Sequence, residues 1–202
     1  MEENHRALGQ EKSSSAATAA ERARHSRGLF AIALLILGGG LLAFWLRALG
    51  GVEALRAELG PATAVAIVPI QALIAVSPFP SEVVAIATSA LYGFWGGALL
   101  AWCAWFTAAF IQYFAVRRAA RDFDFEHARR RLPRRLQELP VSHPAFLIVV
   151  RWFPYGPHIV NSAAGAYEVP LGRHAWCAAV SIVPPALIIS ALANGLFVRL
   201  LE

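Results

Sequence analysis

Charge is missing from most of this 202-residue chain, of which only 15% is Asp, Glu, Lys or Arg and 57% is hydrophobic. Two long stretches, Leu59–Ser81 and Val83–Val116, contain no charged residue at all, and the mean hydropathy of the chain is +0.52. A soluble domain of this length rarely combines so little charge with so many apolar side chains. The composition therefore favours a polytopic membrane protein over a soluble protein with apolar core helices.

Cysteine and methionine are also scarce, with two Cys and one Met. Cys103 and Cys177 each lie in an apolar run, and the sequence contains no CxxC and no ligand spacing for zinc or haem. The chain also lacks an HExxH motif, an aspartate cluster and a GxSx nucleophile, which are signatures of intramembrane enzymes. We therefore expect a protein that is not an enzyme and that has no cofactor and no metal.

Three uncharged runs have the length of a membrane-spanning helix, which needs about 20 residues. They are Gly28–Leu46, Gly93–Val116 and Ala175–Val198. The polar residues before the first run read as a disordered basic tail (1–27) rather than a secretory signal. The remainder, residues 28–202, is expected to form a single membrane domain.

Arginine is concentrated in two blocks. The first block, Arg22, Arg24 and Arg27, lies just before Gly28, and the second block follows Val116. Basic residues beside a span favour the cytoplasmic side, so the N-terminus is expected in the cytoplasm. The second block reads as an interfacial segment on anionic lipid headgroups rather than a nucleic-acid site, because no base-reading motif accompanies it. Its proposed headgroup contacts are Arg117, Arg118, Arg121, Arg129, Arg130 and Arg131.

Two proline-containing turns interrupt the apolar sequence. The first is Pro78-Phe79-Pro80-Ser81-Glu82, and the second runs from Arg151 to His158. Proline breaks a helix and frees backbone groups that lipid cannot satisfy, while a carboxylate in hydrocarbon is costly. Both turns are therefore expected to lie at a functional site. They predict two re-entrant helical hairpins (residues 61–92 and 139–168) that enter from opposite sides as an inverted repeat.

Several of these elements resemble the DedA superfamily, specifically its VTT-domain (SNARE-associated Golgi protein) branch. The resemblance rests on the acidic proline hairpin at 78–82, the glycine-rich run 92–97, and the pairs Tyr113…Arg117 and Phe114…Arg118. It also rests on Arg151-Trp152-Phe153-Pro154 followed by 161–165, with Gly165 and Val169 in a later motif whose last position is His174 instead of Phe or Met. The resemblance implies an all-α integral membrane protein that moves phospholipid or polyprenyl-phosphate lipids between leaflets, in a scramblase-like way or with proton coupling.

The residues at the two turns agree with an anion site. Ser81 and Gly156 or Pro157 stand where the outgoing half-helices begin, and helix N-termini favour anions. Arg151 adds a bidentate donor for phosphate, and Glu82 is expected to pair with it or to take up a proton. The candidate transport site comprises Glu82, Arg151, Ser81, Pro80, Pro154, Pro157, His158 and Asn161.

Each candidate also has a structural alternative. Glu82 could cap its own helix, Arg151 could hold a carbonyl, and His158 could be a packed, hydrogen-bonded side chain. Glu168, Arg173 and His174 are expected as solvated groups at the cytoplasmic interface. Other functions left open are a proton-coupled exporter of small solutes, a membrane scaffold and an enzyme acting on lipid phosphates. The preference for Arg over Lys suggests a bacterial plasma membrane, and homo-oligomerisation is left open.

Overall fold

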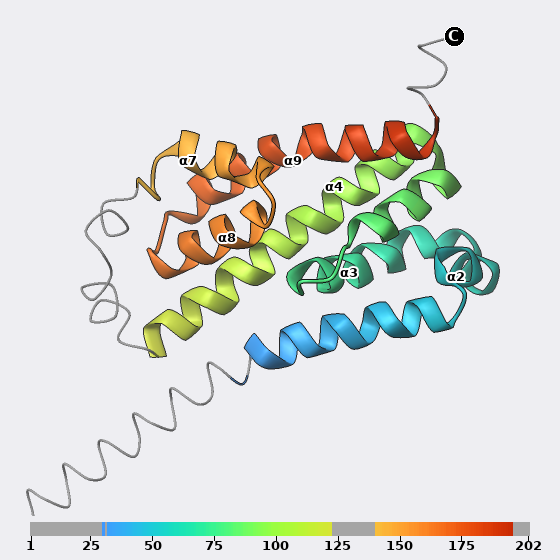
Figure 1. The fold of residues 1–202 in the computed structure, drawn as a ribbon, viewed down its shortest axis with the longest axis horizontal. Helices are drawn as coiled ribbons and strands as arrows, with labels where there is room; N and C mark the ends of the chain where they lie inside the picture. The colour runs from blue at the N-terminus through green and yellow to red at the C-terminus, as the bar shows by residue number, and fades with distance from the viewer. Residues whose placement is uncertain (1–29, 31, 123–139, 196–202) are drawn as a thin grey trace, which may run out of the picture.

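The computed structural model describes residues 30, 32–122 and 140–195, which form helices joined by turns and contain no strand (Figure 1). In chain order the elements are a helix Ile32–Ala48, α2 (Gly51–Leu59), the 3-10 turn η1 (Gly60–Ala62), α3 (Thr63–Val76), α4 (Glu82–Asp122), α7 (Pro144–Val149), the 3-10 turn η2 (Val150–Trp152), α8 (Gly156–Ala166) and α9 (Leu171–Ala193). The all-α prediction is confirmed for these residues. The predicted basic tail (1–27) and Arg129, Arg130 and Arg131 lie outside them.

Three helical stretches are long and apolar enough to cross a membrane: Gly51–Val76, Glu82–Arg121 and Leu171–Ala193. The second and third contain the predicted spans in α4 and α9, up to the end of the described residues. The predicted first span corresponds to the shorter apolar helix Ile32–Ala48. The short helix α2 and the turn η1 continue into α3 without a gap.

Large apolar side chains cover the outside of the helices. Val65 is 78% exposed, Phe44 73% and Trp95 75%. Apolar surface this extensive is unfavourable in water and favourable against lipid chains. The surface thus agrees with the long apolar helices in indicating a membrane environment.

The first helix–turn–helix unit consists of α3, the turn 77–81 and the first part of α4. The backbone leaves the helical conformation at Ser77, and α4 starts where the Ser81 carbonyl accepts the Ala85 N–H at 3.1 Å. α4 is interrupted again at Gly93 (φ 73°, ψ −179°). No atom lies within 4 Å of a Cβ built at Gly93, so its backbone conformation rather than crowding requires glycine. Both breaks occur where the sequence predicted them.

The second unit consists of α7, η2 and α8. Pro144 opens α7, and the His143 ring accepts the Ala145 N–H at 3.2 Å as a cap. α8 begins at Gly156, where a Cβ would overlap the carbonyl oxygen of Val150. Only glycine therefore lets α8 start directly against η2. In Figure 1 the turns of the two units both lie near the middle of the long axis and are reached from opposite ends.

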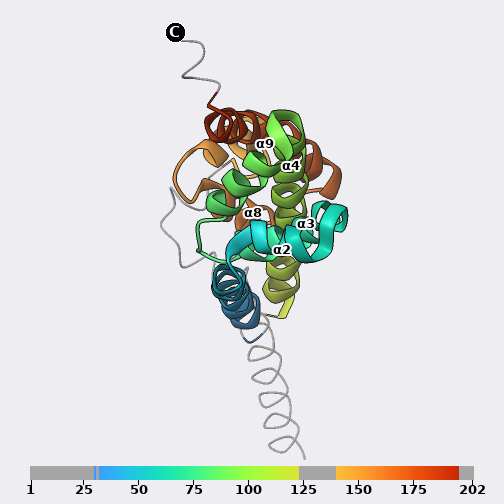
Figure 2. The ribbon, with the colours of Figure 1, turned by 90° about the vertical axis from the view of Figure 1, so that its right-hand side faces the viewer.

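α4 is the central element, and α3, α8 and α9 pack against it (Figures 1 and 2). The Trp102 indole N–H donates to the Ala179 carbonyl at 2.9 Å and joins α4 to α9. Proline inside a helix commonly breaks it, but α9 continues through Pro184 and Pro185 to Ala193. Pro185 cannot donate to the carbonyl four residues earlier, and the Trp152 indole donates to that Ser181 carbonyl at 3.2 Å instead. This substitute donor explains how the helix tolerates the proline.

Candidate functional site

The turn before α4 presents Ser81 and Glu82 to the middle of the bundle. Ser81 is buried, and its hydroxyl accepts the Trp105 indole N–H at 3.0 Å. Its carbonyl begins the helix, so Ser81 occupies the predicted N-cap position while its side chain contacts α4. Glu82 follows as the first residue of α4, where a carboxylate interacts favourably with the helix N-terminus.

The opposite turn carries Arg151, which η2 holds inside the protein. Only 6% of its surface is exposed, although it is a charged residue. One guanidinium nitrogen, Nη2, donates to the Asn161 side-chain oxygen at 2.6 Å, whereas Nε is buried without a hydrogen-bond partner. An unpartnered buried donor is costly, so this guanidinium retains capacity to bind an acceptor.

Two prolines shape the segment between Arg151 and His158. Pro154 and Tyr155 form the centre of a tight turn that is closed by the Gly156 N–H donating to the Phe153 carbonyl at 2.8 Å. Tyr155 has a left-handed conformation (φ 59°, ψ 2°), as the third position of a type II turn requires. Pro157 occupies the first turn of α8, where a missing N–H costs nothing.

Gln112 of α4 connects the two units. Its side-chain nitrogen donates to the Val76 carbonyl at 3.2 Å and lies 2.6 Å from His158 Nδ1, while its oxygen accepts from Asn161 Nδ2 at 2.8 Å. The Val76 carbonyl is available because α3 ends at this residue, and the last carbonyls of a helix have no intrahelical donor. Pro80 is exposed in the turn between α3 and α4.

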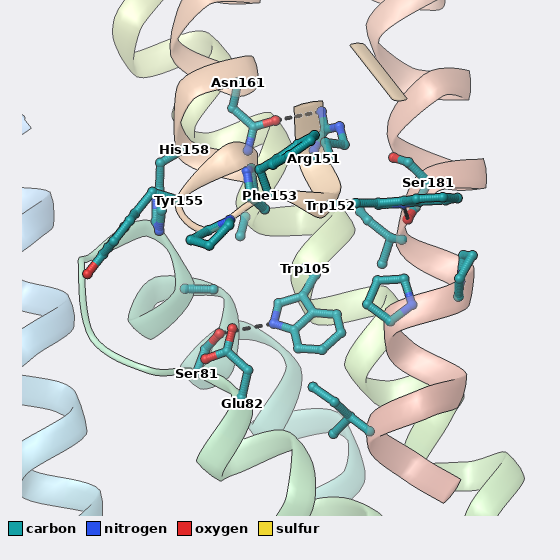
Figure 3. Close-up of a pocket in the computed structure, with 18 of the residues that line it drawn as sticks. Ser81, Glu82, Trp105, Arg151, Trp152, Phe153, Tyr155, His158, Asn161 and Ser181 are labelled. Carbon is teal, nitrogen blue, oxygen red and sulfur yellow. Dashed lines mark hydrogen bonds between the residues drawn. The ribbon is translucent and has the colours of Figure 1, made fainter. Parts of the chain in front are cut away.

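These side chains surround a cavity of about 590 Å³ (Figure 3). Figure 3 shows Ser81, Glu82 and Trp105 on one side of it and Arg151 with Asn161 on the other. Seven of the eight predicted site residues line this cavity: Ser81, Glu82, Arg151, Pro154, Pro157, His158 and Asn161. The eighth, Pro80, is not among the lining residues. The remaining wall comes largely from α9 and is apolar, with Ile182, Ile188 and Ile189.

Glu82 and Arg151 line the same cavity without forming an ion pair. Among the described residues, the carboxylate in ion pairs is Glu168, which binds Arg121 at 3.0 Å and Arg117 at 3.8 Å. One expectation from the sequence, a Glu82–Arg151 pair, is therefore not met in this structure. The reason is local, because Asn161 accepts from Arg151 and Glu82 is exposed to the cavity.

Several residues of the site were not predicted. Gln112, Trp105 and Trp152 make the hydrogen bonds that join α4, α8 and α9 around the cavity. Gln112 had a signal in the sequence, because an amide within the uncharged run Val83–Val116 needs a partner as Glu82 does. The tryptophans had none, since aromatic side chains are common throughout these helices.

A second polar cluster lies where α4 approaches the connection between α8 and α9. The Tyr113 hydroxyl donates to the Val169 carbonyl at 2.7 Å and accepts from Arg117, which also lies over the Tyr113 ring. The hydrogen bond from Arg121, together with the charges of Arg121 and Arg117, lowers the pKa of the exposed Glu168 carboxyl. These contacts hold in place the pair Tyr113…Arg117, one of the two pairs in which an aromatic residue precedes an arginine by four positions.

His174 contradicts one expectation. It was predicted at the solvated interface, but it is completely buried and stacks on Tyr113 with ring centroids 4.8 Å apart. Its position on the face of α9 that packs against α4 explains the difference. An aromatic ring fits there, in agreement with the Phe or Met that the family pattern has at this position.

The chain was compared with families, proteins and structures already known. A model of the VTT domain matches residues 79–194, from the turn before α4 to the residue after α9. The match begins within the first turn and contains the second turn and every helix that lines the cavity except α3. No curated protein and no solved structure matches the chain.

Proposed function

The chain belongs to the VTT-domain family, that of DedA and SNARE-associated Golgi proteins, and from this premise we propose that it moves phosphate-bearing lipids between membrane leaflets. It is a multi-pass membrane protein. The substrates proposed are phospholipids or polyprenyl phosphates. The observation that carries the proposal is the buried Arg151, with an unpartnered Nε, in a cavity shared with Glu82.

The two helix–turn–helix units are proposed as re-entrant hairpins of an inverted repeat. The part of α4 before Gly93 (82–92) has 11 residues, and α8 also has 11. At 1.5 Å per residue each is roughly 16 Å long, less than the hydrocarbon core of about 30 Å. Helices of this length bring their turns to mid-membrane if they start at opposite surfaces, as their opposite approaches in Figure 1 suggest. The site then lies at the bilayer midplane, as in other transporters with broken helices.

Arg151 is the proposed ligand of the phosphate. A buried arginine in hydrocarbon costs a few kcal/mol or more, and a phosphate oxygen accepting from Nε offsets part of that cost. Glu82, on the opposite side, interacts with the positive part of a zwitterionic headgroup or takes up a proton as an anion enters. The apolar side of the cavity, formed by Ile182, Ile188 and Ile189, suits an acyl or prenyl chain.

The interface residues and location extend the proposal. Arg117, Arg118 and Arg121 are proposed to contact anionic headgroups together with Arg129, Arg130 and Arg131, and the N-terminus is proposed on the cytoplasmic side of a bacterial plasma membrane. We propose no enzymatic activity, because nothing in the cavity combines a nucleophile with a base. Proton-coupled export of a small solute and a scaffold role are the alternative functions.

Leaflet exchange of a fluorescent phospholipid in liposomes tests the proposal. The wild type is compared with Glu82→Gln and Arg151→Ala, with folding checked for each by thermal unfolding in detergent. Exchange by the wild type and its loss in folded variants would support lipid translocation through this cavity. Absence of exchange with every headgroup, polyprenyl phosphate included, would contradict it, and variants that lose folding instead would favour the scaffold.

A further inference from the structure

Four side chains form a continuous hydrogen-bonded chain from Arg151 through Asn161 and Gln112 to His158. The distances are 2.6 Å from Arg151 Nη2 to Asn161 Oδ1, 2.8 Å from Asn161 Nδ2 to Gln112 Oε1, and 2.6 Å from Gln112 Nε2 to His158 Nδ1. Arg151, Asn161 and Gln112 are buried, and His158 lines the cavity.

The chemistry of the two ends fixes the direction of every bond. Arginine only donates, so Asn161 must turn its oxygen toward Arg151 and its nitrogen toward Gln112. Gln112 must then accept through its oxygen and donate through its nitrogen, to His158 Nδ1 and to the Val76 carbonyl. His158 Nδ1 therefore accepts, which requires a neutral imidazole with its proton on Nε2.

The link between Gln112 and His158 also separates two cavities. Besides the cavity of Arg151, a second one of about 310 Å³ lies under the helix Ile32–Ala48. Gln112, His158 and Tyr155 line both. A change at this hydrogen bond therefore changes the wall between the two cavities.

We propose that Gln112 and Asn161 are a two-amide relay that couples anion binding at Arg151 to proton uptake at His158. Both are positioning residues that act through Arg151 and His158. The inference rests on the proposed function, because it assumes that Arg151 binds the phosphate of the lipid. It assigns the transported proton to His158 rather than to Glu82.

The step proceeds by rotation of two amides. An anion bound bidentately to Arg151 Nε and Nη2 takes Nη2 from the Asn161 oxygen, so the Asn161 amide rotates and its nitrogen donates to the anion. Gln112 rotates in turn, its nitrogen donates to the Asn161 oxygen, and its oxygen faces His158 Nδ1. A proton from water then binds Nδ1 and donates to Gln112, so one anionic charge and one proton enter together.

The Val76 carbonyl gives the relay its resting orientation. It accepts from Gln112 Nε2 at 3.2 Å and loses this donor when the amide rotates. Without an anion nothing compensates for the loss, so His158 stays neutral. By linkage, protonation of His158 must strengthen anion binding by the same factor by which the anion favours protonation.

The charged and titratable groups around His158 are few in the described part of the chain. Glu82, Arg151 and Tyr155 share a cavity with it. In the second cavity, α4 contributes Gln112 beside His158, and the end of α3 with the following turn contributes Val76 and Pro78. The helix Ile32–Ala48 contributes apolar side chains. The Glu82 carboxylate attracts a positive charge on His158 and the Arg151 guanidinium repels it, so an anion that neutralises Arg151 favours the protonated imidazole.

The test is nitrogen NMR of the full chain in detergent micelles, with the imidazole rings labelled with nitrogen-15. The probe is sulfate, a tetrahedral anion that does not itself titrate between about pH 5 and 8, where histidine does. His158→Gln identifies the His158 signals among the six histidines. We expect Nδ1 of His158 to be unprotonated without sulfate. Saturating sulfate should raise its protonated-to-neutral ratio about tenfold, the size of one hydrogen bond to a charged group.

Variants separate the relay from general effects. In Gln112→Leu saturated with sulfate, the ratio should not change, and in Gln112→Glu His158 should be protonated even without sulfate, because a carboxylate only accepts. The control Thr107→Ala, on α4 and outside both cavities, should keep the response.

Two results would overturn the relay: bound sulfate that leaves the His158 ratio unchanged in the wild type, or a response that persists in Gln112→Leu. A wild type that binds no sulfate would instead contradict the anion site, and with it both proposals.

Discussion

Replacing Arg151 by lysine separates the geometry of its donors from its charge. Arg151 donates Nη2 to Asn161, and its Nε has no hydrogen-bond partner. Lysine preserves the positive charge but has no planar fork, so it cannot bind a phosphate in the bidentate way. The structure therefore predicts that Arg151→Lys loses one charge-assisted hydrogen bond to the ligand.

The expected size follows from that one bond. A hydrogen bond to a charged group contributes about 1.5–3 kcal/mol. At 1.4 kcal/mol per factor of ten, phosphate binding should weaken roughly 10- to 150-fold. Calorimetric titration of the detergent-purified protein with sulfate measures the binding, and leaflet exchange measures transport.

The matched control is Arg173→Lys. Arg173 is an exposed arginine that donates to the Ser142 carbonyl at 2.9 Å and lies outside the cavity. It should bind and exchange like the wild type. If Arg151→Lys also matches the wild type in both assays, charge alone suffices and the donor argument is refuted.

Three further predictions concern the elements that hold the site. Glu168→Gln should destabilise the protein at about pH 7 and progressively less as the pH falls below about 4, because Arg121 lowers the pKa of Glu168 and the stability this contributes is lost as the carboxylate is protonated. Gly93→Ala should cost about 1–3 kcal/mol of unfolding free energy, since its conformation is almost exclusive to glycine. Trp105→Phe should cost about 1 kcal/mol through the lost bond to Ser81, and slow lipid exchange.

Thermal unfolding in detergent at several pH values measures all three. Gly172→Ala, where a Cβ meets no atom within 4 Å, is the matched control for Gly93→Ala and should not destabilise the protein. If Gly93→Ala leaves the free energy of unfolding unchanged, α4 does not require the observed backbone conformation at Gly93. If the destabilisation by Glu168→Gln does not change with pH, the ion pair between Glu168 and Arg121 is excluded.

The helix breaks were predictable because they depend on local chemistry. Proline removes a donor and glycine allows a backbone conformation closed to other residues, so the ends at Pro78–Ser81 and the interruption at Gly93 can be read from neighbouring residues. The cavity was predictable in part from these breaks. Because both turns were expected to lie near one another, Glu82 and Arg151 were expected in one site. In the structure both residues line one cavity.

The partners of these residues were not predictable, because they depend on how distant helices pack. Whether Arg151 meets Glu82 or Asn161 is decided by the rotation of η2 against α8, which no local pattern encodes. The same holds for His174, whose burial depends on which face of α9 meets α4. Prolines mislead when a distant donor replaces their missing N–H, as Trp152 does for Pro185.

The central claim is that the cavity handles lipids through their phosphate, and headgroup selectivity tests it most directly. Two fluorescent lipids with matched chains, a phosphatidylglycerol and a glucosylceramide without phosphate, are placed in the same protein-containing liposomes, and the exchange of each is measured. The account predicts that the protein accelerates exchange of the phosphate lipid and that Arg151→Ala abolishes this acceleration. Equal acceleration of both lipids, unchanged by Arg151→Ala, would contradict it.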